Sequence, residues 1–447
     1  MTAENPSQRR HHLDAIRVSA ILLLIPYHAA RYVQKGDGDP RIVDAVVWFV
    51  HTWHMPLFFA ISGFLAASAL RRSTAALQVR ARFRRLGLPL VVGMLTVVPL
   101  ANFFVIGAAA LWPRKGALPP KRELDLANVF GFTPRHLWFI SYLLIVSLLA
   151  IGVWLAIQRA PRMGAAIKRG FGQLMRSWWA VPALAAISAA ILITKTGWVA
   201  GGSASNSLIP APTLFAYYGL FFAFGWLLSG QGDLIEGLKR GAWLRLGAGA
   251  LIAVPAFLLF YDNGDFTGNV GTPGILAEIG ELRPYGLFTV GLVCWLTLFG
   301  IWGVLARYVR KESRVLRYLS DASFWIYLVH IPFLVALQST LSTTDLAIPV
   351  RWGLAVSGTL ALALGSYALI RSTRKLVRTY RVRHAPRVVA TPRRDWRNPR
   401  VRLASAGPSG GRTLGGRMAA PFGRLRTTPR AVCPAPPDVR GGFANPS

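Results

Sequence analysis

Ten apolar runs follow one another along most of the chain, and they constrain its fold more than any other feature of the sequence. A helix needs about 20 consecutive apolar residues to cross roughly 30 Å of hydrocarbon, and each run is close to that length. The sequence therefore predicts an all-α, polytopic transmembrane helix bundle of about ten spans. The fifth and sixth runs fit the pattern least well. The runs lie near residues 13–33, 46–70, 86–110, 137–158, 178–195, 212–229, 243–261, 284–305, 318–341 and 350–370.

The composition agrees with a membrane protein and argues against a soluble one. Hydrophobic residues make up 53% of the 447 residues and charged residues only 15%, whereas about a quarter of a soluble domain is charged. The mean hydropathy is positive, at +0.41. Lipid requires this deficit of charge, because an unpaired charge in hydrocarbon costs roughly 3 kcal/mol or more.

The net charge is +33. Its basic residues lie mainly in connections between the apolar runs and in the last segment, a distribution that indicates membrane topology and not a nucleic-acid-binding surface. Basic residues crowd the connections after the second, fourth and eighth runs, whereas the connections after the fifth, seventh and ninth runs hold few. The connection after the third run is the exception. Positive-inside bias predicts that both termini are cytoplasmic, an N-in/C-in topology. We expect no nucleic-acid partner, because no basic face on a folded soluble module is visible.

The chain changes character after residue 370. The segment 371–447 holds 18 arginines and lysines against two acidic residues and is rich in proline and glycine. Because it lacks apolar periodicity, it cannot bury a core. We therefore predict a membrane-embedded domain at 9–370 and a disordered, basic, cytoplasmic tail at 371–447.

The first span contains three ionisable residues, Asp14, Arg17 and His28, and such groups inside lipid are pointers to function. At about 100° per residue, Arg17 and His28 fall on one helix face, separated by about 16 Å along the axis. Asp14 lies one turn before Arg17 and can pair with it. In a purely structural interpretation, Arg17 extends to the membrane–water interface and His28 forms a hydrogen bond with a neighbouring helix. The helix face that the two residues share favours a functional interpretation instead.

The second span brings two further histidines, His51 and His54, to a depth similar to that of His28. Three imidazoles can bind zinc, but no carboxylate or further ligand is visible nearby. We therefore expect no metal, and interpret His51 and His54 as groups that bind substrate or support His28.

The ninth span carries a polar stripe of Ser323, Tyr327 and His330 on one face. An interhelical hydrogen-bond ladder would explain these residues as well as catalysis does. The arginines after the second span, including Arg82 and Arg85, serve topology, and they also suit an anionic ligand such as the phosphates of a nucleotide carrier.

Together these residues resemble the acyltransferase-3 superfamily of integral-membrane O-acyltransferases, over roughly residues 9–370. The family's arginine–histidine pair in the first span is present as Arg17 and His28. Its histidine–proline segment ending in FFxISGF begins here at His54, with proline two residues after the histidine. Its cytoplasmic Arg-x-x-Arg is present as Arg82 and Arg85. The later blocks HLWFISYLL and SFWIYLVHIP contribute His136, Trp138, Tyr327 and His330.

The resemblance implies an inner-membrane enzyme that moves an acetyl or succinyl group from cytoplasmic acyl-CoA to an extracytoplasmic carbohydrate, with no bound cofactor. Several blocks are most similar to members credited with succinylating periplasmic glucans. His28 would be the base, and Arg17 would orient the carrier or pair with a succinyl carboxylate. The partners that the resemblance implies for this protein are acyl-CoA, the carbohydrate acceptor and the lipid bilayer. The implied substrate-binding residues are Asp14, His51, His54, Arg82, Arg85, His136, Trp138, Tyr327 and His330.

A proton-coupled transporter or glycan exporter is the main alternative, since histidine and arginine at membrane depth would serve it too. A transporter should show broken helices paired between two repeats, and no such repeat is evident. A structural scaffold would explain the spans but not the ionisable face of the first one.

Overall fold

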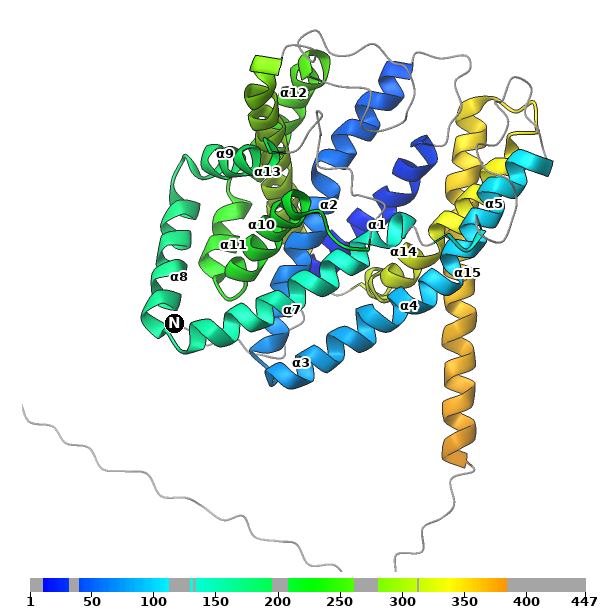
Figure 1. Cartoon of the computed structure of the whole chain (residues 1–447), viewed down its shortest axis with the longest axis horizontal. Helices are drawn as coiled ribbons and strands as arrows, with labels where there is room; N and C mark the ends of the chain where they lie inside the picture. The colour runs from blue at the N-terminus through cyan, green and yellow to red at the C-terminus, as the bar shows by residue number, and fades with distance from the viewer. Residues whose placement is uncertain are drawn as a thin grey trace, which may run out of the picture. The chain divides into compact units, whose positions relative to one another are not determined.

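The computed structural model describes residues 11–31, 40–111, 129–131, 134–194, 208–260, 280–311 and 313–383. Every regular element in these ranges is helical, which confirms the predicted all-α class (Figure 1). The helices are α1 (His11–Arg31), α2 (Pro40–Leu70), α3 (Ala75–Arg82), η1 (Phe83–Gly87), α4 (Leu88–Leu95), α5 (Val97–Leu111), η2 (Arg135–Leu137), α7 (Trp138–Gln158), α8 (Pro161–Arg176), α9 (Ala180–Leu192), α10 (Pro212–Leu228), α11 (Gly232–Lys239), α12 (Ala242–Phe260), η4 (Gly280–Leu282), α13 (Arg283–Tyr308), α14 (Arg314–Leu341) and α15 (Ile348–Arg383).

Eight helical segments in the described residues are long and apolar enough to cross a membrane, and the number rises to ten if two bent pairs are each one span. The bent pairs are α8 with α9, at 115°, and α10 with α11, at 109°. They contain the two apolar runs that fit the spanning pattern least well. The bend after α10 uses Gly230, whose φ of 91° lies in the left-handed region that glycine adopts without strain.

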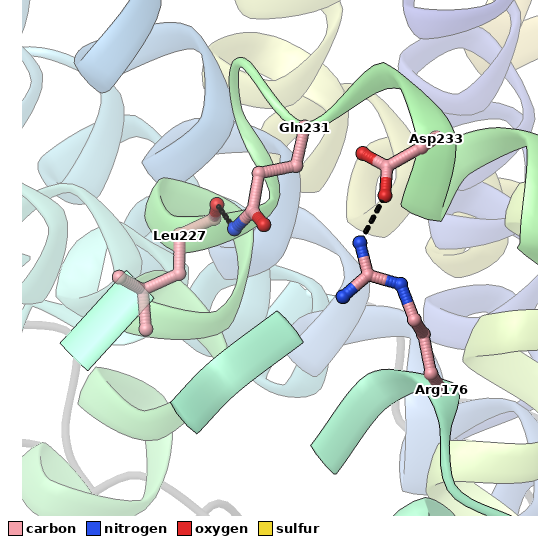
Figure 2. A network of polar contacts seen from close by, with 4 residues as sticks. All are labelled: Arg176, Leu227, Gln231 and Asp233. Carbon is pink, nitrogen blue, oxygen red and sulfur yellow. Dashed lines mark hydrogen bonds and ion pairs between the residues drawn. The ribbon is translucent and has the colours of Figure 1, made fainter. Parts of the chain in front are cut away.

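Polar contacts join the two bent pairs (Figure 2). The guanidinium of Arg176, at the end of α8, forms an ion pair with Asp233 in the first turn of α11. Gln231, just before α11, donates from Nε2 to the carbonyl of Leu227 at 2.8 Å. The bends after α8 and after α10 are therefore linked to each other, and each leads to a short helix.

The last helix extends beyond the predicted membrane domain. α15 continues to Arg383, past residue 370 where the apolar run ends. The first residues of the predicted tail are therefore helical, because the helix is not obliged to stop where the hydrophobic stretch does. The rest of that predicted tail, residues 384–447, lies outside the described residues.

The centre of residues 11–383 is formed by α1 and α2, which pack against each other, with α13 against α2 and α14 against α1 (Figure 1). Helix α10 also crosses α2, at a contact made by one glycine from each helix. A methyl group at Gly63 of α2 would overlap the carbonyl of Phe222, and one at Gly225 of α10 would overlap the carbonyl of Ala60. Small residues at such a crossing let two backbones approach closely inside a membrane.

This crossing predicts a contrast between two glycines of α10. Gly225→Ala should lower the free energy of unfolding by about 1–3 kcal/mol, because the new methyl group forces the two backbones apart. Gly219→Ala is the matched control, since a methyl group there meets no atom within 4 Å. Thermal unfolding of both purified variants in detergent measures the difference. Equal melting temperatures would show that the crossing is not tightly packed.

Candidate active site

Five histidines that are distant in the sequence lie together inside the helical bundle. We call them, with the tyrosine that connects them, the histidine cluster. Helices α1 and α2, the turn η2 just before α7, and the middle of α14 each contribute to it, so four separate segments must pack together to form it. Its members are Tyr27, His28, His51, His54, His136 and His330.

One side of the cluster runs from α1 to α14 and on to the start of α7. The ring centroids of His28 and His330 are 5.1 Å apart, and those of His330 and His136 are also 5.1 Å apart. His330 is fully buried and His136 is buried, whereas His28 is half-buried. His28 is therefore the member of this row that a substrate can reach most easily.

The other side of the cluster is organised around Tyr27. Its ring contacts His28 at 4.9 Å between centroids, His51 at 5.4 Å and His54 at 5.1 Å. The Tyr27 hydroxyl and Nδ1 of His51 form a hydrogen bond of 2.8 Å. Tyr27 thus joins the two histidines of α2 to His28, a role that the sequence analysis did not assign to it.

A proline in α14 explains how His136 is held. Pro332 lies inside the helix and has no N–H, so it leaves the carbonyl of Leu328, four residues earlier, without its helical donor. His136 Nε2 lies 3.1 Å from that carbonyl oxygen. Because a carbonyl can only accept, His136 must donate from Nε2. Its own carbonyl accepts a hydrogen bond from the Tyr327 hydroxyl, so the start of α7 is attached to α14 twice.

Several ring nitrogens of the cluster have no hydrogen-bond partner among the described residues. They are both nitrogens of His54, Nδ1 of His136 and Nε2 of His330, and all are buried. A buried polar atom left without a partner costs about 1–3 kcal/mol. Polar groups of a ligand or ordered water would satisfy these atoms, which is the pattern expected of a binding site rather than of a purely structural core.

Arg17 and His28 both face α14, as their spacing on α1 predicted. The Arg17 guanidinium donates to Ser323 Oγ at 3.0 Å and to Ser320 Oγ at 3.4 Å. Ser320 Oγ in turn donates to Asp14 at 2.6 Å. Asp14 and Arg17 are therefore connected through a shared serine, and this polar group lies on the same pair of helices as His28 and His330.

The polar stripe of α14 makes contacts along its whole length. Its residues meet two different partners, α1 and η2 just before α7, so an interhelical hydrogen-bond network and the candidate active site share one surface. The three contacting pairs are Ser323 with Arg17, Tyr327 with His136, and His330 with His28.

Trp138 follows His136 by two residues and begins α7. Its half-buried ring contacts Tyr142 and Tyr218, with centroids 5.3 and 5.4 Å away. Tyr218 stacks on Phe59 of α2 at 4.7 Å. Trp138 therefore belongs to an aromatic layer that packs α7, α10 and α2 together.

Arg82 and Arg85 occupy a separate part of the structure. Arg82 ends α3, and Arg85 lies in η1, a π-helical turn between α3 and α4. Such turns are frequent at functional sites, and the sequence did not predict this one. Arg82 is half-buried, and its Nε has no hydrogen-bond partner among the described residues. Within the described ranges, neither arginine contacts the histidine cluster.

The geometry does not assemble a metal site from the residues that the structure describes. Among them, no group of three or more histidine, cysteine, aspartate or glutamate side chains could hold a metal ion. The cluster instead offers one accessible imidazole, buried imidazoles behind it and a nearby arginine. Such a set can accept a proton and bind polar groups.

Comparison with known proteins agrees with this chemistry. An acyltransferase domain matches residues 10–371. Glucans biosynthesis protein C of Escherichia coli O6:K15:H31 is 26% identical over 345 residues, 73% of this chain and 82% of the relative. The proteins of that name from Salmonella heidelberg and Salmonella typhimurium are 27% identical over 349 residues, 73% of this chain and 83% of theirs. No solved structure matches the chain. The family match covers most of the chain, which therefore belongs to the acyltransferase-3 family and is a multi-pass membrane acyltransferase.

Proposed function

We propose that this protein transfers an acetyl or succinyl group from acyl-CoA on the cytoplasmic side to a hydroxyl of an extracytoplasmic carbohydrate, such as a periplasmic glucan, across a bacterial inner membrane. The name of the relatives, glucans biosynthesis protein C, supports a role in making glucans. The observation that carries the proposal is His28, half-buried at the edge of a buried histidine cluster and on the same helix pair as Arg17.

The chemistry assigned to His28 is general-base catalysis. Its imidazole takes the proton of the acceptor hydroxyl while the hydroxyl oxygen attacks the thioester carbonyl carbon. The carbon–sulfur bond then breaks, and the coenzyme A sulfur leaves and receives the proton from the imidazolium. An ordinary imidazole has a pKa of about 6.5, which suits both accepting and returning a proton near neutral pH.

Two separate arginine sites would bind different parts of the acyl donor. Arg82 and Arg85 would hold the phosphates of acyl-CoA, because guanidinium binds phosphate with paired hydrogen bonds. Arg17, held by Ser320 and Ser323, would orient the acyl chain and would pair with the free carboxylate if the group is succinyl. Predicted topology places Arg82 and Arg85 on the cytoplasmic side and His28 deeper in the membrane.

The decisive experiment gives membranes that contain the protein an acyl-CoA radiolabelled in its acyl group, together with glucan. We expect the label to become covalently attached to the glucan. Glucan that crosses the membrane without gaining label would overturn the proposal in favour of export.

Replacing the base should remove the chemical step and leave donor binding intact. We expect His28→Ala to lower the rate of label transfer by about 10²- to 10⁴-fold, the usual contribution of a general base, while acyl-CoA still binds. His11→Gln is the matched control, since His11 begins the same helix and lies outside the cluster. Full transfer by His28→Ala would refute the assignment.

Removing a donor-site guanidinium should act on binding instead. Arg82→Gln and Arg85→Gln should each raise KM for acyl-CoA by about tenfold or more, because a charge-assisted hydrogen bond contributes roughly 1.5–3 kcal/mol, and should leave kcat nearly unchanged. Arg80→Gln on the same short helix serves as the control. If all three variants share one KM, the phosphates bind elsewhere.

A further inference from the structure

We propose that α8 lies along the cytoplasmic surface of the membrane and binds anionic phospholipid headgroups through Arg162, Lys168 and Arg169. The bilayer covers the apolar side chains that the protein leaves exposed on the same helix. This inference goes beyond the proposed function and does not depend on it, because α8 holds no residue of the candidate active site.

The two faces of α8 differ in chemistry. Apolar side chains recur every three or four positions and form one stripe, whereas arginines recur every seven positions and form a second stripe on the opposite side. The segment 159–179 contains no acidic residue. Such a division between apolar and basic faces is typical of helices that lie in the plane of a membrane surface. The apolar stripe is Met163, Ile167, Phe171 and Leu174, and the arginine stripe is Arg162, Arg169 and Arg176.

The place of α8 in the chain brings it to the membrane surface. Only two residues separate its start from the end of α7, which is long and apolar enough to cross the membrane, and three separate its end from the apolar α9. Predicted topology puts this connection in the cytoplasm. Figure 1 shows α8 at the edge of the bundle, crosswise to both neighbours, and the bend to α9 is 115°. A helix that joins two membrane segments in this way runs along the surface.

Two properties make α8 unsuited to cross the bilayer. Its 16 residues extend over about 24 Å, which is less than the roughly 30 Å of hydrocarbon. Four of its side chains are basic, and charged side chains are rare in segments that cross lipid. At the surface, by contrast, the aliphatic stems of lysine and arginine can extend along apolar material while their charges reach the headgroups.

The protein covers only part of the apolar stripe. Phe171, in the second half of α8, packs on Phe224 of α10 with ring centroids 5.9 Å apart. In the first half, Met163 and Ile167 are 50% and 40% exposed. The apolar side chains of α11, the short helix of the other bent pair, are instead buried by the bundle. Lipid acyl chains therefore cover the part of α8 that no helix covers.

The basic side chains of α8 are complementary to an anionic lipid surface. Arg162, Lys168 and Arg169 are exposed, and none of their side chains forms an ion pair or hydrogen bond with another described residue. Arg176 differs, because it forms an ion pair with Asp233 of α11 (Figure 2). Anionic lipids of the cytoplasmic leaflet attract basic segments of this kind. Phospholipid phosphates are therefore the ligands that these three side chains fit.

Two tryptophans follow α8 directly. Trp178 is 90% exposed and Trp179 is 49% exposed, and both lie between α8 and the apolar α9. Tryptophan is enriched at membrane–water interfaces, where its ring contacts apolar material and its N–H finds a polar partner. The bend between α8 and α9 is therefore placed at the level of the headgroups.

Spin labels on the two faces of α8 test its orientation. They are attached to Ile167→Cys and, separately, to Arg169→Cys, in protein that carries Cys433→Ser and keeps the buried Cys294. The protein is reconstituted in vesicles of phosphatidylcholine with a minor fraction of phosphatidylglycerol. We expect the label on the apolar face to collide with oxygen, which dissolves in lipid, and the label on the basic face to collide with a water-soluble nickel chelate. Any other pattern overturns the inference: nickel access at both positions means that α8 projects into water, and oxygen access at both means that it crosses the bilayer.

The lipid preference is measured at the same position. A fluorophore on Ile167→Cys is quenched by brominated phosphatidylglycerol or by brominated phosphatidylcholine, and the ratio reports which headgroup gathers beside α8. We expect phosphatidylglycerol to quench more strongly. Combining Arg162→Gln, Lys168→Gln and Arg169→Gln should lower that preference about fivefold or more, because each basic side chain near an anionic surface contributes a factor of about five. High salt should act in the same direction, since it screens exposed charges.

A matched control removes three charges from another predicted cytoplasmic connection. Arg310→Gln, Lys311→Gln and Arg314→Gln replace exposed side chains around the start of α14, and together they should leave the preference unchanged. Equal loss in both triple variants would show an effect of net charge alone, and no loss in either would show that α8 does not select anionic lipid. Either result overturns the inference, as does loss of acyl-CoA binding by the α8 variant with its lipid preference intact. None of these measurements requires acyl transfer.

Discussion

The candidate active site depends on one backbone carbonyl that a proline leaves free. Pro332 removes the helical donor of the Leu328 carbonyl, and His136 supplies another from the start of α7. Inside a membrane this exchange matters, because lipid offers the carbonyl no hydrogen-bond donor. It also determines the tautomer of His136 and, through the Tyr327 hydroxyl bonded to the His136 carbonyl, brings α7 and α14 together beside His330.

The same requirement explains why the polar residues of the bundle occur in groups. Arg17, Ser320 and Asp14 satisfy one another across α1 and α14, and Tyr27 and His51 do so across α1 and α2. Several buried nitrogens of the histidine cluster, at His54, His136 and His330, have no partner among the described residues, as do other buried atoms such as Arg82 Nε. The satisfied pairs join the helices of the bundle, and in the histidine cluster several partnerless nitrogens lie close together.

Under the proposed function, donor binding and the chemical step would occur in different parts of the structure. Arg82 and Arg85 lie on α3 and its π-helical extension, whereas His28 lies among α1, α2, α14 and the start of α7. In that proposal, a long carrier such as acyl-CoA would bridge the two places, with its charged end outside the apolar region and its thioester inside it. The close glycine crossing of α2 and α10 supports the wall that carries His51 and His54.

The sequence alone determined the helical class, the near-complete set of spans, and the shared face of Arg17 and His28, because hydropathy and helical periodicity are local properties. It also pointed to His28, His51, His54 and His330, since an ionisable group is unusual in lipid, whereas His136 was named only through the family resemblance. Tertiary structure decided what local pattern cannot encode: that five histidines meet, that Tyr27 connects them, and that two apolar runs break into bent pairs. Those outcomes depend on which helix faces pack together, and hence on contacts between residues up to about 300 positions apart, such as Arg17 with Ser323.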